Sequence, residues 1–169
     1  MTMLSDYFSL EELIHSQYAA RHGIDNVPPP DVLANLGRTA HRMDDVRKRL
    51  GALPIIVSSG YRSTRVNSAI GGVTFPPSAH TLGYAVDFTC PTFGPPLEIC
   101  QRLAAQADLA FDQLIFEYGA WVHISFDPRN RRELLTIRSS AEGYVRGIVD
   151  LPPIERAPVS AAIARRSAA

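Results

Sequence analysis

Two histidines and one aspartate occupy positions from which they can converge on a metal ion. His80 and Asp87 lie on either side of a turn marked by Gly83, and His123 lies inside the apolar run 121–125. Two imidazoles and one carboxylate suit Zn²⁺, and a set of three leaves a fourth position free, as in catalytic rather than structural zinc sites. A buried histidine bonded to an aspartate is also an ordinary core feature, so these residues alone do not establish a metal site.

The residues around this set resemble those of a known family. The motifs are Phe8-Ser-Leu-Glu-Glu-Leu13, Gly23-Ile-Asp-Asn26, Ser58-Ser-Gly-Tyr-Arg-Ser63, Asn67 with Gly71-Gly72, Ser78-x-His80-x-x-Gly83-x-Ala85-x-Asp87, Asp112-Gln-Leu-Ile-x-Glu117 and Trp121-Val-His123-Ile-Ser125. Over most of positions 7–149 the chain is similar to zinc peptidases of the D-alanyl-D-alanine carboxypeptidase type, especially the small single-domain members. The resemblance implies that His80, Asp87 and His123 bind one zinc ion, and that the substrate is a peptidoglycan stem peptide or another small peptide.

The chemistry implied by this resemblance is metal-assisted amide hydrolysis. Zinc would polarise the scissile carbonyl and lower the pKa of a water molecule toward ~7, while a carboxylate accepts the water proton. By resemblance, Arg62 grips a substrate carboxylate or carbonyl, which a planar guanidinium can bind in bidentate fashion. The alternative for Arg62 is a surface ion pair. Ser78 is expected to bind substrate or to orient the loop before His80, with a plain turn residue as the alternative.

The general base is where this sequence departs from many relatives. They carry an Asp or Glu three residues before the last zinc histidine, whereas here the residue at that distance from His123 is Ala120. The nearest acidic candidate is Glu117, and Asp112 and Asp127 are the other candidates. We therefore expect Glu117 to be the catalytic carboxylate.

The turn after Glu117 decides whether that expectation is possible. A three-residue turn would place Glu117 opposite Trp121, on the same face as His123, because strand faces repeat every two residues. A two-residue turn would pair Glu117 with Val122 and direct it to the opposite face. An acid in an apolar hairpin is expensive to hold without a role, which favours the three-residue turn.

The sequence pattern predicts one α+β domain over residues 1–150, in which a small antiparallel sheet carries the zinc site and helices pack behind it. By resemblance the fold is Hedgehog- and DD-peptidase-like. Helices are predicted over 10–21, 31–50 and 97–107, with helical turns over 63–70, and strands over 54–59, 84–90, 111–118 and 121–126. The β-branched run in 54–59 is typical of a buried strand. Residues 151–169, rich in Pro, Ala and Arg, are expected to form a peripheral tail.

Composition narrows the class of protein. The 17 basic and 17 acidic residues balance, so no nucleic-acid footprint is predicted. No apolar run is long enough to insert in a membrane, and the N-terminus has no ordinary secretion signal. We therefore expect cytoplasmic synthesis and action on the cell wall after release or as a phage component. The sequence does not predict an oligomeric state.

Several residues are given ordinary roles. Cys90 and Cys100 are expected to be small buried residues, with a disulfide between them as the alternative. Tyr61 and Trp121 are expected to be core aromatics, although either could form a wall of the cleft. The arginine-rich segment 129–132 is expected to be solvated surface.

Two functions remain open at this point. The first is an active zinc peptidase, either a D,D-carboxypeptidase or an endopeptidase of the endolysin kind. The second is a non-catalytic relative that uses the zinc fold as a binding module or as a structural component of a phage particle. Complete zinc ligands favour the first function, and Ala120 keeps the second open.

Overall fold

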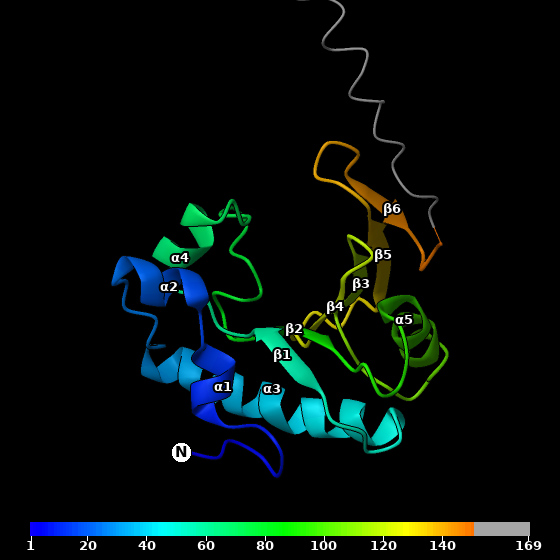
Figure 1. Cartoon of the computed structure of the whole chain (residues 1–169), viewed down its shortest axis with the longest axis horizontal. Helices are drawn as coiled ribbons and strands as arrows, with labels where there is room; N and C mark the ends of the chain where they lie inside the picture. The colour runs from blue at the N-terminus through cyan, green and yellow to red at the C-terminus, as the bar shows by residue number, and fades with distance from the viewer. Residues whose placement is uncertain (151–169) are drawn as a thin grey trace, which may run out of the picture.

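The computed structural model describes residues 1–150 as a sheet with helices packed against it (Figure 1). The predicted tail over 151–169 lies outside the described residues. The elements are α1 (Leu10–Ile14), α2 (Gln17–His22), α3 (Pro30–Arg49), β1 (Ile56–Ser59), α4 (Thr64–Ala69), β2 (Ala85–Thr89), α5 (Pro96–Ala104), β3 (Gln113–Glu117), β4 (Trp121–Ser125), β5 (Glu133–Ile137) and β6 (Tyr144–Arg146). The α+β class is therefore confirmed.

The sheet is mixed rather than purely antiparallel. Its six strands follow the order β1-β2-β4-β3-β5-β6. The strands from β1 to β3 pair antiparallel, as predicted, but β5 runs parallel to β3. The segment after β4 places Glu133 beside Gln113, so β5 begins at the end of the sheet where β3 begins. Neither β5 nor β6 was predicted, and it is the addition of β5 that makes the sheet mixed.

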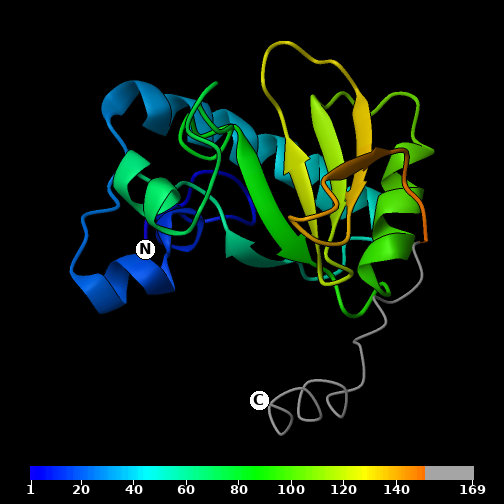
Figure 2. The same cartoon turned by 90° about the horizontal axis from the view of Figure 1, so that it is seen from above.

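The main core lies between the sheet and two helices. Figure 2 shows α3 passing behind the strands and α5 beside them. Leu36 and Met43 of α3 and Ile99 of α5 pack with the apolar side chains of the strands that point backward, such as Phe88 and Ile124. Because strand side chains alternate between faces, the opposite face is left for the polar residues of the site.

The N-terminal helix predicted over 10–21 is two helices. The Ser16 hydroxyl accepts a hydrogen bond from the backbone N–H of Ala19 and caps α2. The helix is therefore interrupted between Ile14 and Gln17. Ser9 caps α1 in the same way, and Gly23 ends α2 in the left-handed conformation. The helix is divided because Ser16 is a good cap.

The strand expected to be buried, β1, lies at the edge of the sheet. Ile56 is 56% exposed, because only β2 covers this strand. The β-branched run predicts strand conformation but not the number of neighbouring strands. Cys90 and Cys100 are free and buried, as expected. Within residues 1–150, no helix is long and apolar enough to cross a membrane.

Candidate metal centre and active-site cleft

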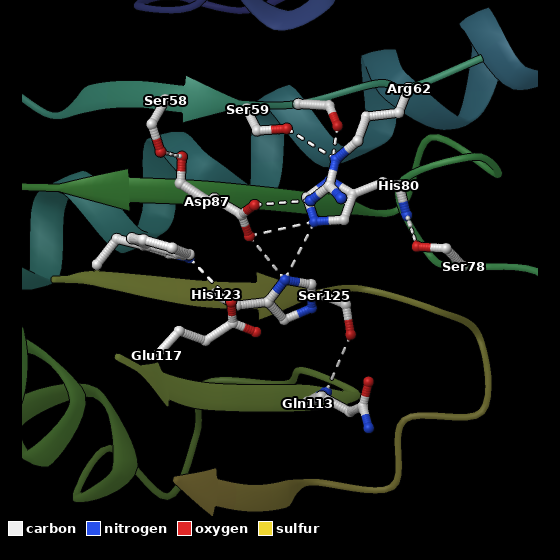
Figure 3. A network of polar contacts seen from close by, with 12 residues as sticks. Ser58, Ser59, Arg62, Ser78, His80, Asp87, Gln113, Glu117, His123 and Ser125 are labelled. Atoms are coloured by element: carbon white, nitrogen blue, oxygen red, sulfur yellow. Dashed lines mark hydrogen bonds and ion pairs between the residues drawn. The ribbon is translucent and has the colours of Figure 1, made fainter. Parts of the chain in front are cut away.

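Three ligand atoms meet on the front face of the sheet. Asp87 on β2 stands directly opposite His123 on β4, and His80 enters from the turn before β2 (Figure 3). The His123 Nδ1 and Asp87 Oδ1 atoms are 2.8 Å apart, and His80 Nε2 lies 3.1 Å from the same oxygen and 3.2 Å from His123 Nδ1. All three side chains are buried. The residues predicted as zinc ligands are thus brought together.

The backbone around His80 fixes its ring. The His80 Nδ1–H group donates to the carbonyl of Gly60 over 2.6 Å, so the neutral ring has its lone pair on Nε2. Gly60 packs against the backbone of Leu13, where a Cβ atom would collide with the Leu13 carbonyl. Glycine is required there because any side chain would move the carbonyl that orients His80.

The charges in this cluster fit a divalent cation. Burial lowers the pKa of His80 and outweighs the attraction of Asp87, which favours the neutral ring. Burial alone would raise the pKa of Asp87, but its contacts with the imidazoles hold it well below its ordinary value, and Asp87 raises the pKa of His123 against the effect of burial. Because the Nδ1–H group of His80 donates to Gly60, the lone pair of Nε2 faces a carboxylate oxygen 3.1 Å away. A shared cation removes that repulsion.

The spacing of the donor atoms also fits zinc. Tetrahedral Zn²⁺ with bonds of roughly 2.0–2.1 Å has ligand atoms about 3.3 Å apart. The three separations here run from 2.8 to 3.2 Å. Two nitrogens and one oxygen leave one position of the tetrahedron for substrate or water.

Arg62 contacts a metal ligand rather than solvent. One guanidinium nitrogen donates to Asp87 Oδ2 over 2.8 Å, and Nε donates to the Ser59 hydroxyl over 2.9 Å. The Arg62 side chain is only 15% exposed. This is a part-buried ion pair with a metal ligand, so the alternative of a surface ion pair was wrong. Its role as a substrate ligand stays a prediction.

Ser78 lies in the turn that leads into His80. Its hydroxyl accepts a hydrogen bond from the backbone N–H of His80 over 3.3 Å, and its carbonyl accepts one from the Thr81 hydroxyl. Ser78 therefore orients the loop before His80. Substrate binding by Ser78 stays a prediction.

The hairpin between β3 and β4 has the register that a catalytic Glu117 requires. Glu117 pairs with Trp121 across a three-residue turn, in which Tyr118 and Gly119 have φ angles of 55° and 70°. Glu117 therefore lies on the face that carries His123. The Trp121 indole N–H donates to Glu117 Oε2 over 2.9 Å. Burial raises the pKa of Glu117.

The two other acidic candidates are engaged elsewhere. Asp112 is fully buried and accepts hydrogen bonds from the backbone N–H and the guanidinium of Arg131. Asp127 accepts hydrogen bonds from the guanidinium of Arg129. These carboxylates hold the loop after β4, so of the three candidates only Glu117 lies on the metal-bearing face.

A cleft of about 990 Å³ lies over the three ligands. The loop between α4 and β2 forms one wall, and β3, β5 and β6 form the other. Trp121 lines this cleft, so the expectation of a core position was wrong for it. Tyr61 is 5% exposed and does belong to the core.

Sequence reasoning missed the outer wall of the cleft, which is formed by β5, β6 and the segment 129–132. The segment 129–132 is not merely solvated surface, because Arg129 and Arg131 line the cleft and pair with aspartates. Arg132 stacks over the Phe111 ring and donates to backbone carbonyls near the end of α5. Only the alternation of acidic and basic residues could have signalled these pairs. Arg146 of β6 lines the same cleft and has no sequence motif around it.

The comparisons with known proteins agree with this geometry. No curated protein matches the chain in a sequence search. A sequence model of the peptidase M15 family matches residues 6–125, which include all three ligands and Glu117 but end before β5 and β6. The match covers well over half of the chain, so this chain belongs to the peptidase M15 family, the zinc metallopeptidases of the D-alanyl-D-alanine carboxypeptidase type.

Proposed function

We propose that the chain is a zinc-dependent peptidase that hydrolyses an amide bond in peptidoglycan stem peptides. The observation that supports this most directly is the convergence of three ligand atoms in a cleft that also contains an acid. His80, Asp87 and His123 would hold the ion, and Glu117 lies on the same sheet face. A binding site without catalysis would not need that acid.

The residues have separate roles in the proposed reaction. When bound, zinc supplies Lewis-acid chemistry, which polarises an amide carbonyl and acidifies a water molecule. Glu117 accepts the proton of the attacking water and passes it to the leaving amine. Within residues 1–150, only one oxygen of Glu117 has a hydrogen-bond donor, the Trp121 indole, and the other is left for this proton.

Arg62 and Ser59 hold the metal-binding aspartate in place. Asp87 offers one oxygen to the ligand cluster and the other to Arg62, which fixes the orientation of the carboxylate. The guanidinium has further N–H groups beyond those bonded to Asp87 and Ser59, and these can donate to a substrate carbonyl or carboxylate.

The alternative function is a non-catalytic binding module or a structural component of a phage particle. Its main support is Ala120, which stands where many relatives have the base. The hairpin register weakens that support, because Glu117 supplies a carboxylate on the same face as His123. We therefore favour the enzyme.

Product mapping tests the proposed function. Zinc-loaded wild-type protein and the Glu117→Gln variant are incubated with synthetic stem peptides and with digested peptidoglycan, and the products are identified by mass spectrometry. We expect one amide bond to be cut, and kcat to fall by about 10² or more in Glu117→Gln while zinc content is unchanged. The position of the cut distinguishes a carboxypeptidase from an endopeptidase.

Two results would contradict this assignment in different ways. Undiminished turnover by Glu117→Gln would remove Glu117 from the mechanism. A wild-type protein that binds zinc fully but cuts none of these substrates would favour the binding module.

A further inference from the structure

One row of cross-strand neighbours connects the metal centre to the outer edge of the sheet. The row runs across β2, β4, β3, β5 and β6 through Asp87, His123, Ile115, Leu135 and Arg146. Residues paired in register point to the same face of a sheet. Arg146 therefore stands on the face that carries the ligands, and it lines the same cleft.

The spacing of the strands places Arg146 within reach of a bound peptide. Three strand-to-strand steps separate His123 from Arg146, which at about 4.8 Å each gives roughly 14 Å between their backbones. An extended peptide rises about 3.3 Å per residue, so this span corresponds to about four residues. A peptide cut at the metal can thus present a group to Arg146.

The surface between the two ends of the row is apolar. Ile115, Leu135 and Ile137 form a small buried cluster on this face, separate from the main core behind the sheet. Tyr144 shares the face of β6 with Arg146 and is 55% exposed. A peptide lying along the row would cross an apolar floor with one cation at its far end.

Of the arginines that line the cleft, Arg146 is the one for which residues 1–150 supply no ion-pair partner. Four arginines line the cleft. Three of them form ion pairs: Arg62 with Asp87, Arg129 with Asp127, and Arg131 with Asp112 and Glu133.

Among residues 1–150, by contrast, Arg146 has no hydrogen-bond or ion-pair partner for its guanidinium, and it is exposed. Glu133, an acid on the same wall, accepts from Gln113 and pairs with Arg131 instead. A free guanidinium that faces a cleft is suited to bind a carboxylate.

We propose that Arg146 is a specificity-determining residue that binds a carboxylate of the peptide substrate, within about four residues of the scissile bond. The proposal rests on the proposed peptidase function. It also assigns a purpose to β6, which lies beyond the residues matched by the family model. The carboxylate is either the C-terminus of the peptide or an internal acidic group.

Calorimetric binding of matched peptides tests this role without requiring turnover. The probe is a synthetic stem pentapeptide in four forms: the free acid, the C-terminal amide, the internal-carboxylate amide and the double amide. Each is titrated into zinc-loaded full-length protein carrying Glu117→Gln, with and without Arg146→Gln. Arg21→Gln is the control, because Arg21 is an equally exposed arginine on α2 outside the cleft.

We expect Arg146→Gln to weaken binding of the free acid by about tenfold or more, and Arg21→Gln to change it less than about twofold. The two forms that lack the recognised carboxylate, one single amide and the double amide, should bind the proteins with and without Arg146→Gln equally, and the single amide that does so identifies that carboxylate as terminal or internal. An equal loss for all four forms, no loss for any form, or no measurable binding of the free acid before Arg146 is changed would overturn the proposal.

The result is separable from the test of catalysis. A protein that cuts no peptide but loses carboxylate binding in Arg146→Gln contradicts the proposed reaction and retains this site. A protein that cuts stem peptides but binds them equally well with and without Arg146→Gln supports the proposed reaction and contradicts this site.

Discussion

The two walls of the cleft are built by different means. On the metal-bearing side, His80, Asp87 and His123 are 2%, 5% and 7% exposed, and each is held by the hydrogen bonds of its neighbours. On the outer side, all three residues of β6 are exposed. Catalysis needs atoms that are fixed to a fraction of an ångström, whereas a group that binds a substrate carboxylate can lie on an exposed edge strand.

The outer wall is joined to the rest of the sheet by a few specific contacts. Asp112, at the start of β3, is fully buried and holds Arg131 just before β5. The Thr136 hydroxyl on β5 donates to the carbonyl of Gly147 after β6. The difference between the walls predicts that changes on the inner side lower zinc binding or catalysis, while changes on the outer side alter stability or substrate choice.

The largest effect is expected from the metal ligands. His80→Ala should lose both zinc and activity, because it removes one of three donors. Metal content and kcat/KM are measured on the same sample. His41→Ala is the matched control, since its side chain is 69% exposed and lies outside the cluster. Full zinc occupancy in His80→Ala would show that the inner wall is not a metal site.

The second-largest effect is expected on the stability of the fold, from the ion pair that anchors the outer wall. Arg131→Ala leaves the buried carboxylate of Asp112 without its main partner, which should lower the free energy of unfolding by about 3 kcal/mol. Arg129→Ala should cost only about 1 kcal/mol, because the Arg129 side chain is 52% exposed and its nitrogen lies 3.6 Å from Asp112, beyond hydrogen-bonding distance. Chemical denaturation measures both. Equal costs would mean that Asp112 does not anchor this wall.

The same pair predicts a dependence on pH. Burial alone would raise the pKa of Asp112, but its bonds to Arg131 hold the pKa below the ordinary value. A lowered pKa in the folded state stabilises the fold above the unfolded-state pKa of about 3.9, and this contribution is lost as the pH falls below it. The stability difference between wild type and Arg131→Ala should therefore be constant near neutral pH and shrink below about pH 4.

A smaller effect is expected from Arg62, which lies at the inner wall. Arg62→Lys keeps the charge but cannot bond Asp87 and Ser59 together through one planar group. Zinc affinity should fall about tenfold, and kcat/KM at saturating zinc should also fall about tenfold. Metal titration and steady-state kinetics separate the two losses. If both quantities are unchanged, Arg62 neither holds the aspartate nor binds substrate.

The smallest effect is expected from Trp121, which lies on β4 and donates a hydrogen bond to Glu117 on β3. Trp121→Phe keeps the ring in the cleft but removes the N–H group that donates to Glu117. We expect kcat to fall about three- to tenfold with KM and zinc content unchanged. A rise in KM alone would make Trp121 a surface for the substrate rather than a positioning residue for Glu117.

The inner wall could be predicted from sequence, and the outer wall could not. His80, Asp87 and His123 belong to short motifs, and it was the resemblance of these motifs to a known family, rather than their spacing alone, that identified them as metal ligands. The position of Glu117 stayed open because it depended on one turn, which the left-handed conformations of Tyr118 and Gly119 determine.

Contacts between distant segments escaped the sequence analysis. The pair of Arg62 with Asp87 depends on the register of β1 against β2, which periodicity does not give. The short, exposed strand β6 has little apolar alternation to detect, and its place depends on β5 lying parallel to β3. Arg146 therefore had no recognisable signal.

Anomalous X-ray scattering at the zinc absorption edge, from crystals of the zinc-loaded protein, tests the metal centre most directly. We predict one strong peak at roughly 2.0–2.2 Å from His80 Nε2, His123 Nδ1 and Asp87 Oδ1. A protein that takes up no zinc, or a peak bound by other residues while these three remain hydrogen-bonded to one another, would contradict the assignment.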